Sequence, residues 1–346
     1  MSPALALHVR RAGWAKGEGR AMETATQHHE QTPMRPLTVI VVSYNTRELT
    51  LDALRSLRDQ TDPALYELIV VDNLSSDGSA DAVVREFPSA RLIRSERNLG
   101  FAAANNLAAK QAVGEYLLLI NPDTVTLDRA VERLLAFAKR EPSSQIWGGR
   151  TLFADRRLNP ASCWQRPTPW SLFCIATGLA RVFHHSALFN PEAFGGWDRG
   201  TERSVDIVSG CFLLLKRALW ERLGGFDPAF FMYGEEADLC LRAHRLGARP
   251  RVTPDATIIH YGGASEKARA DKLVRLFRAK RLLFERHLGP LSRWWCTRML
   301  DLWVVTRLAA AMLTRGLGRG AAAWQTWTAV GAQRAQWHGE PSRGAA

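Results

Sequence analysis

The sequence predicts an α/β fold with a mainly parallel sheet flanked by helices, followed by a helical extension at the C-terminus. Short, continuously apolar runs alternate with amphipathic stretches in the first half of the chain. This alternation is typical of parallel strands that helices cover on both faces. Apolar residues make up 46% of the 346 residues, which is enough for a sizeable core.

The expected elements follow in order along the chain. Strands are predicted at 37–43, 67–72, 90–95 and 116–121, with helices between and after them at 47–59, 79–86, 101–112 and 127–140. The later pattern is mixed α+β: a strand and helix over 205–227, a helix over 235–247, a strand over 256–263 and a basic helix over 265–288. The tail from residue 291 is rich in Trp and Arg.

The chain divides into three parts by composition. Residues 1–35 have no apolar period and are expected to be a flexible leader, without the apolar run of a signal peptide. Residues 36–288 form the expected main domain, and 289–346 the basic, Trp/Arg-rich helical tail. Charged residues interrupt the most apolar part of this tail, so no membrane span is expected.

Composition also limits the class of protein. The five Cys residues are scattered without metal-ligand spacing, which fits a reducing compartment and argues against a zinc module. The formal net charge of +12 suggests an anionic partner. Nucleic acid, an acidic lipid surface and a diphosphate substrate all remain open on this ground.

Polar residues follow the predicted strands where a ligand would bind. In an open parallel sheet the ligand lies outside the carboxyl ends of the strands, which gathers residues 43–45, Asp72, 97–98 and 121–123 around one crevice. The loop after the first strand, "SYNTRE", has no glycine, which disfavours a dinucleotide-binding fold, and no P-loop motif follows a strand. A carboxylate-bound divalent cation is therefore the natural group to neutralise a diphosphate.

Six motifs then appear in a familiar order. They are "VSYNTRELTLDALRSL", "IVVDNLSSDGS", "RNLGFAAANN", "LLLINPDTV", "GGFDPAFFMYGEEADLCLRAHRLG" and "IIHYGGAS". Over about residues 37–288 the chain resembles the family 2 glycosyltransferases of GT-A fold, and within them the bacterial rhamnosyltransferase group.

The resemblance implies a nucleotide-sugar site at the first strand ends. The residues expected to contact the donor are Ser43, Tyr44, Asn45, Asp72, Asn98, Asn121 and Arg150. A carboxylate at a strand end can accept from the N3–H of uracil or thymine, and a tyrosine ring can pack on the base. The alternatives are a turn-forming Asp72, a core Tyr44 and a surface Arg150.

The same resemblance implies a site for Mg²⁺ or Mn²⁺. Asn121-Pro122-Asp123 stands where the family has D-x-D, so Asp123 becomes the principal anionic ligand and Asn121 offers only a carbonyl oxygen. His260 stands where relatives place a metal-binding His. The alternative is that Pro122 ends the strand and that Asp123 or Thr126 caps the helix over 127–140.

The acidic start of the helix over 235–247 implies the catalytic base. By position Glu236 takes the role that the family gives to an Asp, and Asp238 is the reserve candidate. An acidic first turn is also ordinary composition for a helix start. Four residues are expected in the acceptor region, namely Asp206, Ser209, Gly210 and Glu235.

These residues together imply an inverting transfer. The expected donor is dTDP-L-rhamnose, and the expected acceptor is a glycan or a lipid-diphosphate-linked glycan in cell-surface polysaccharide synthesis. The alternatives are a galactofuranosyl- or other hexosyltransferase of the same family, and a non-catalytic sugar-nucleotide-binding protein prompted by the departures at Asn121 and Glu236.

The tail leaves two interpretations open. Interleaved Trp and Arg suit the interface of an anionic membrane, which predicts a cytoplasmic enzyme in peripheral contact with the inner face of the cell membrane. Packing of the tail onto the catalytic domain is the equal alternative. No nucleic-acid-binding module is recognised, and we expect no nucleic-acid partner.

Overall fold

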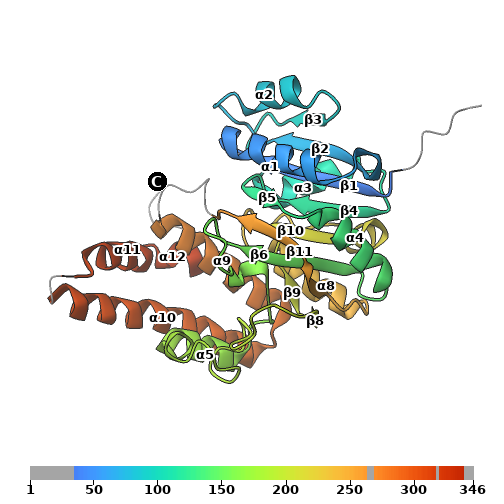
Figure 1. Ribbon diagram of the computed structural model, residues 1–346. Helices are drawn as coiled ribbons and strands as arrows, with labels where there is room; N and C mark the ends of the chain where they lie inside the picture. Colours follow the sequence, from blue (N-terminus) through green and yellow to red (C-terminus); the bar gives the residue numbers. More distant parts are fainter. Residues whose placement is uncertain (1–34, 263–268, 317–318, 339–346) are drawn as a thin grey trace, which may run out of the picture. The chain divides into compact units, whose positions relative to one another are not determined.

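A nine-stranded sheet forms the centre of this computed structural model, which describes residues 35–262, 269–316 and 319–338 (Figure 1). The strand order is β3-β2-β1-β4-β10-β6-β11-β5, and β8 pairs with β11. The strands are β1 (Leu37–Ser43), β2 (Tyr66–Asp72), β3 (Arg91–Arg94), β4 (Tyr116–Ile120), β5 (Thr124–Thr126), β6 (Ile146–Leu152), β8 (Arg203–Ser204), β10 (Phe212–Lys216) and β11 (Arg251–His260). Two further strands, β7 (Cys163–Trp164) and β9 (Ile207–Val208), pair with each other.

The sheet changes character along its width. Strands β3, β2, β1 and β4 are parallel to one another, and the register sets Ser43 beside Asp72. Strand β10 runs antiparallel to both β4 and β6, while β11 is parallel to β6 and antiparallel to β5. The predicted α/β class is confirmed, with a parallel half that holds the first strand ends and a mixed half beside it.

Helices cover both faces of the sheet because apolar side chains alternate along its strands. Side chains of α1, α2 and α4 pack with Val39, Val41 and Leu118 on one face, and side chains of α3, α7 and α8 pack with Ile40, Leu119 and others on the opposite face. The helices are α1 (Arg47–Gln60), α2 (Ser79–Glu86), α3 (Gly100–Ala109), α4 (Ala130–Arg140), α5 (Pro169–Thr177), α6 (Leu179–Val182), α7 (Arg217–Leu223), α8 (Glu235–Arg245), α9 (Arg269–His287), α10 (Pro290–Gly316), α11 (Ala321–Ala332) and α12 (Arg334–His338).

Some element boundaries differ from the predicted ones. Helix α4 begins at Ala130 instead of 127, because the short strand β5 follows Asp123 and pairs with β11. Gly148, Gly149 and Arg150 lie inside β6, whereas the sequence suggested that they follow the strand. The predicted leader, apart from Arg35, and the start of the predicted helix over 265–288 lie outside the described residues.

The C-terminal helices form a third apolar cluster with α5 and α9. Phe277 of α9 contacts the rings of Trp303, Trp327 and Trp337, and Trp337 is buried. Hydrogen bonds tie α10 to the end of α5, from Thr306 to the Ala176 carbonyl and from Arg307 to the Ile175 carbonyl. Part of the tail therefore packs against the helices that precede it.

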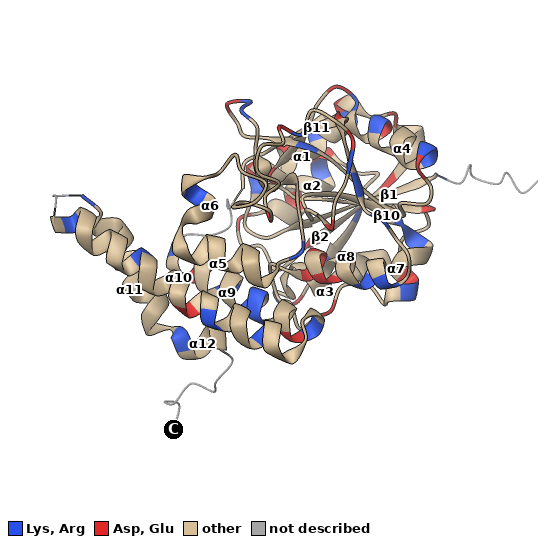
Figure 2. Ribbon diagram, turned by 90° about the horizontal axis from the view of Figure 1, so that it is seen from below, with Lys and Arg blue, Asp and Glu red and all other residues tan. Residues whose placement is uncertain are grey.

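Basic residues are distributed over many helices, including α4, α7 and α9 as well as the tail (Figure 2). Helix α10 is 27 residues long but carries arginines along its length. Among the described residues, none of the helices is both long enough and apolar enough to serve as a membrane span.

Candidate functional site

A cleft of about 480 Å³ lies at the carboxyl ends of β1 and β4 and at the end of β11. Nine of the residues that the sequence predicts for the site line it together: Tyr44, Asn98, Asn121, Asp123, Ser209, Gly210, Glu235, Glu236 and His260. They come from loops far apart in the sequence, and the strand order brings them to one edge of the sheet.

Asp123 and His260 form the centre of one side of the cleft. The Nε2 atom of His260 lies 3.1 Å from Oδ1 of Asp123 and 3.2 Å from Nδ2 of Asn121. The other carboxylate oxygen of Asp123 accepts a hydrogen bond of 2.9 Å from the amide of Gly262. Helix α4 begins well beyond Asp123 and has no side-chain cap, so Asp123 and Thr126 do not cap it.

The protonation equilibria of this pair reflect their contact. Burial raises the pKa of Asp123, but the hydrogen bond and charge of His260 and the Gly262 amide outweigh it and lower the pKa below its usual range. Burial lowers the pKa of His260, while the neighbouring Cys211 and Asp123 raise it to about 10. An imidazolium next to a carboxylate balances the charge that a bound cation would otherwise balance.

These residues fit a divalent cation as a small ligand set. The carbonyl oxygen Oδ1 of Asn121 is buried and has no hydrogen-bond partner, which leaves it available as a ligand. A carboxylate, an imidazole and an amide oxygen are a donor set that Mn²⁺ accepts. Among the described residues, no group of three or more His, Cys, Asp or Glu side chains is placed to hold a metal.

Two adjacent carboxylates enter the cleft at the start of α8. Gly234 precedes the helix with φ of 85°, a conformation that suits glycine, and the chain then turns directly into Glu235 and Glu236. Both side chains are buried, and Oε2 of each has no hydrogen-bond partner in the structure. Burial raises the pKa of Glu236, and burial together with the charge of Glu236 raises the pKa of Glu235 well above its usual value.

The residues predicted around the nucleoside divide into two groups. Tyr44 is 37% exposed and lines the cleft. Ser43 is buried and its hydroxyl bonds with the hydroxyl of Thr50, while Asn45 accepts hydrogen bonds from Ser76. These two residues hold the loops in place and do not line the cleft.

Asp72 is the last residue of β2 and is not among the residues that line the cleft. One of its carboxylate oxygens accepts from the amide of Ser75, and the other is buried without a partner. The next residue, Asn73, does line the cleft and donates to the side chain of Asn98. Asn73 was not predicted as a site residue, although its position directly after the Asp that ends a strand could have indicated this role.

Besides Ser43, Asn45 and Asp72, three more of the predicted residues do not line the cleft. Asp238 is a buried residue of α8, and its carboxylate pairs with Arg242 at 2.6 Å and with His287 at 2.8 Å. Asp206 pairs with Arg166 at a separate cavity, because β9 lies between it and Ser209. Arg150 extends from β6 beside Thr257 of β11 and is not among the residues that line the cleft.

Aromatic residues complete the walls of the cleft, and none of those named here was predicted as a site residue. Phe101, Trp164, Tyr233 and Tyr261 line it, and the ammonium group of Lys272 lies 5.7 Å from the centre of the Tyr233 ring. The run "FFMYG" before α8 is the sequence signal that could have indicated part of this wall. A cleft with apolar rings, two buried carboxylates and a candidate cation site can bind a polar ring compound that carries phosphates.

The sequence matches Glycosyl transferase family 2 over residues 38–223. It is 28% identical over 280 residues to the N-acetylglucosaminyl-diphospho-decaprenol L-rhamnosyltransferase of Mycobacterium tuberculosis, covering 75% of this chain and 86% of that protein. It is 26% identical over 245 residues to the rhamnosyltransferase WbbL of Escherichia coli, covering 68% and 88%.

Two further comparisons concern a longer protein and a solved structure. The chain is 29% identical over 258 residues to the O-antigen biosynthesis protein RfbC of Myxococcus xanthus, covering 70% of this chain but only 19% of that longer protein. The mannosyltransferase PcManGT from Pyrobaculum calidifontis, solved with GDP-Man and Mn²⁺, superposes with a TM-score of 0.53 at 19% identity, and 86% of each chain is covered. At this identity the likeness supports the fold alone, and it agrees with the expected GT-A architecture.

Proposed function

Since the chain belongs to glycosyl transferase family 2 and is a glycosyltransferase, we propose that it is an inverting enzyme that takes a sugar from a nucleotide-diphosphate donor. L-rhamnose from dTDP-rhamnose is the first candidate, because the matched relatives of M. tuberculosis and E. coli are both named rhamnosyltransferases. The proposed acceptor is a glycan or a lipid-diphosphate-linked glycan of a cell-surface polysaccharide.

The observation that carries the proposal is the pairing of two functions in one cleft. Glu236 offers a buried carboxylate with an unpartnered oxygen, and Asp123 with His260 and Asn121 offers a fitting cation site. A base for the acceptor hydroxyl and a group that stabilises a departing diphosphate are the two requirements of an inverting transfer.

In the proposed mechanism each residue has a separate task. Tyr44 packs on the base, and Asp72 and Asn98 hold the nucleoside end of the donor. Asp123, His260 and the Asn121 carbonyl hold Mg²⁺ or Mn²⁺, which when bound supplies positive charge to the diphosphate. Glu236 accepts the proton from the acceptor hydroxyl as the oxygen attacks the anomeric carbon on the side opposite the diphosphate.

The acceptor side of the cleft comprises Ser209, Gly210 and Glu235. Burial raises the pKa of both carboxyls, and the charge of Glu236 adds to the rise at Glu235, so a protonated Glu235 can donate a hydrogen bond to the acceptor while Glu236 acts as the base.

The first test is the substitution Glu236→Gln. It should lower kcat for transfer by about 10³-fold while leaving donor affinity within about twofold, because the amide keeps the shape but cannot accept the proton. Donor affinity is measured by calorimetry with the nucleotide sugar. Glu221→Gln on α7, an exposed site, is the control and should leave both quantities unchanged. Turnover that survives Glu236→Gln would show that another group is the base.

A donor panel separates the proposed sugar from its alternatives. Hydrolysis of dTDP-rhamnose, UDP-galactofuranose and other sugar nucleotides is measured with Mn²⁺, Mg²⁺ or EDTA in the absence of acceptor. We expect dTDP-rhamnose to be hydrolysed fastest and EDTA to stop the reaction. Faster hydrolysis of UDP-galactofuranose would favour the other hexosyltransferase, and binding without any hydrolysis would favour the non-catalytic alternative.

The proposed lipid-linked acceptor gives a role to the exposed apolar residues near α5 and α10. Val182, Phe183 and Leu188 follow α5, and α10 exposes six large apolar side chains, namely Leu291, Trp294, Trp295, Val305, Met312 and Leu313. The two elements contact each other. With Arg181, Arg293 and Arg315 in the same segments, this surface has the composition of a peripheral contact with an anionic membrane.

A further inference from the structure

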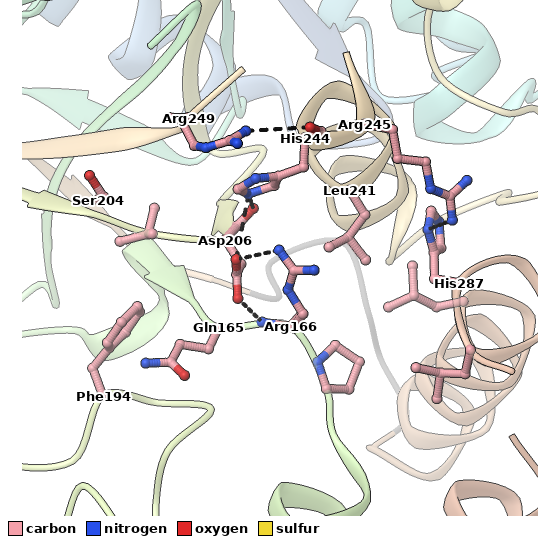
Figure 3. A pocket seen from close by; sticks show the side chains of 14 residues that line it. Gln165, Arg166, Phe194, Ser204, Asp206, Leu241, His244, Arg245, Arg249 and His287 are labelled. Carbon is pink, nitrogen blue, oxygen red and sulfur yellow. Dashed lines mark hydrogen bonds and ion pairs between the residues drawn. The ribbon is translucent and has the colours of Figure 1, made fainter. Parts of the chain in front are cut away.

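A second cavity, of about 640 Å³, lies at the C-terminal end of α8 (Figure 3). The transfer cleft lies at the start of the same helix. Nine residues separate Glu236 from Arg245, which is about 14 Å along a helix. The short strand pair β7–β9 also separates the two spaces. Trp164 and Ser209 line the cleft, whereas Gln165 and Asp206 line the cavity.

Part of the charge in this cavity is neutralised internally. Asp206 accepts from the guanidinium of Arg166 at 2.8 Å and from its backbone amide at 2.9 Å, so the two form a closed pair (Figure 3). His244 lies 3.2 Å from the backbone carbonyl of Asp206, and burial lowers the pKa of its imidazole. His244 is therefore neutral at physiological pH, and this side of the cavity carries no net charge.

Arg245 and Arg249 leave two positive charges at the cavity. Arg245 donates through Nη2 to the Arg286 carbonyl and to Nδ1 of His287, and Arg249 donates through Nη1 to the carbonyls of His244 and Ala248. Neither has a carboxylate within 4.0 Å in the part of the chain that the structure describes. His287 lies 2.9 Å from Arg245 through Nδ1 and 2.8 Å from Asp238 through Nε2, so both of its ring nitrogens have partners inside the protein.

The two guanidinium groups are held in place and retain free donors. On each residue these hydrogen bonds use one terminal nitrogen, so Nε and the second terminal nitrogen have no partner within the described part of the chain. A plain helix-capping role accounts for the bonds to the carbonyls, since both arginines contact C-terminal helix turns. It does not account for a cavity of this size between them, whose remaining wall includes Leu241, Leu283 and Leu288.

We propose that this cavity is a second binding site, for a phosphate or diphosphate ester of an apolar group, with Arg245 and Arg249 as the anion anchors. Guanidinium forks match phosphate oxygens, and charge-assisted hydrogen bonds of this kind are the strong ones. The leucine wall takes the apolar part of the ligand. The inference does not depend on the identity of the sugar or of the base in the transfer cleft.

The test is calorimetric binding of geranyl diphosphate and of inorganic pyrophosphate to the full chain in EDTA. Without a divalent cation the transfer cleft lacks its diphosphate partner, so binding reports on the cavity. Geranyl diphosphate should bind more tightly than pyrophosphate because of the leucine wall, and both should weaken with rising salt. Arg245→Gln with Arg249→Gln should weaken binding by at least about tenfold.

Two matched variants keep the test decisive. Arg85→Ala removes an arginine from the last turn of α2, away from the cavity, and should leave binding unchanged. Ser204→Glu adds a carboxylate to the cavity wall without removing a charged partner, and should also weaken binding if the double variant folds poorly. Asp123→Asn, in the transfer cleft, should leave the affinity for both probes in EDTA unchanged.

The proposal is overturned if neither probe binds, or if binding is indifferent to both the double variant and Ser204→Glu. Equal affinity for pyrophosphate and geranyl diphosphate would overturn the proposal that the ligand carries an apolar group. It would identify a free phosphate or diphosphate anion as the occupant. These readouts are binding constants in the absence of a cation, so they are independent of whether transfer occurs.

Discussion

Glu235 and Glu236 are unusual as residues because both are buried, both have an oxygen without a hydrogen-bond partner, and they adjoin each other. In the folded protein each therefore holds its proton to a higher pH than a free glutamate does. A carboxylate acts as a base only in its ionised form. The raised pKa should therefore appear in the acid limb of the pH–rate profile.

We expect kcat/KM to rise with pH through the raised pKa of Glu236, above the range of an unperturbed glutamate. The measurement is a pH–rate profile of transfer between pH 4.5 and 9, with circular dichroism to check folding at each end. Glu236→Asp should move the acid limb and lower the rate, while Glu221→Gln should leave the profile in place. An acid limb at the position of a free glutamate would contradict the assignment.

Asn121 gives a second prediction, which concerns the affinity of the candidate cation site for Mn²⁺. Its carbonyl oxygen is available but uncharged, so the candidate cation site has one carboxylate where the family pattern has two. Asn121→Asp should tighten Mn²⁺ binding by about tenfold, because ligand charge sets the affinity of oxygen sites. Asp123→Asn should weaken it by at least as much. Mn²⁺ titration followed by electron paramagnetic resonance measures both, and equal affinity in all three proteins would remove Asp123 from the site.

The family resemblance and the strand-end positions together predicted nine of the residues that line the cleft. Ser43, Asn45 and Asp72 were also predicted but do not line it. The prediction failed for Asp238, Asp206 and Arg150 as well, because a position in the sequence does not give the direction of a side chain. Asp238 follows Glu236 by two residues, which on a helix is about 200° around the axis. It therefore points to α9 and not into the cleft.

Helix α8 shows how one element serves two purposes. Its first turn presents Glu235 and Glu236 to the cleft, and Asp238 joins it to α9 through His287. Burial raises the pKa of Asp238, but His287 and Arg242 outweigh burial and hold the pKa below its usual range. The stability that this carboxylate contributes is present above its unfolded pKa and is lost as the pH falls through the lowered folded value.

Asp238→Asn should therefore destabilise the protein by about 3 kcal/mol at pH 7, since it leaves Arg242 without its buried partner. The cost should shrink as the pH falls through the lowered pKa of Asp238. Glu221→Gln breaks an exposed pair at the same helical spacing and should cost less than about 0.5 kcal/mol. Urea unfolding at pH 7 and at a series of pH values below 3.8, the ordinary pKa of an Asp carboxyl, measures both. A loss of transfer by Asp238→Asn in a protein of unchanged stability would instead favour Asp238 as the base.

At the scale of the whole molecule, the tail is both a packing partner and an exposed surface. Val330 and Trp337 are buried in the cluster around Phe277. Removing 291–346 would expose that cluster to solvent, and the newly exposed apolar surface would itself alter vesicle binding. Met312 and Leu313 are 66% and 74% exposed, and changing them leaves the cluster intact. Point substitutions are therefore the proper test of membrane contact.

Met312→Gln with Leu313→Gln should lower co-sedimentation with phosphatidylglycerol vesicles by about tenfold, because two large apolar side chains no longer enter the interface. Activity on a water-soluble acceptor should persist. Val84→Gln changes an exposed apolar residue of helix α2, which covers the sheet, and is the matched control that should bind vesicles as the parent does. Unchanged binding by the double variant would leave these residues without a role at a membrane.

The sequence by itself determined the order of the strands and helices, the class of fold and the identity of the polar residues that follow the strands. Apolar periodicity and strand-end position are local properties, and they survive in a linear chain. Only the tertiary structure decided that β10 runs antiparallel between β4 and β6, that Asp238 pairs with His287, and that Asp206 belongs to another cavity. These facts depend on which distant segments pack together and on which way each side chain then points, and no local pattern encodes either.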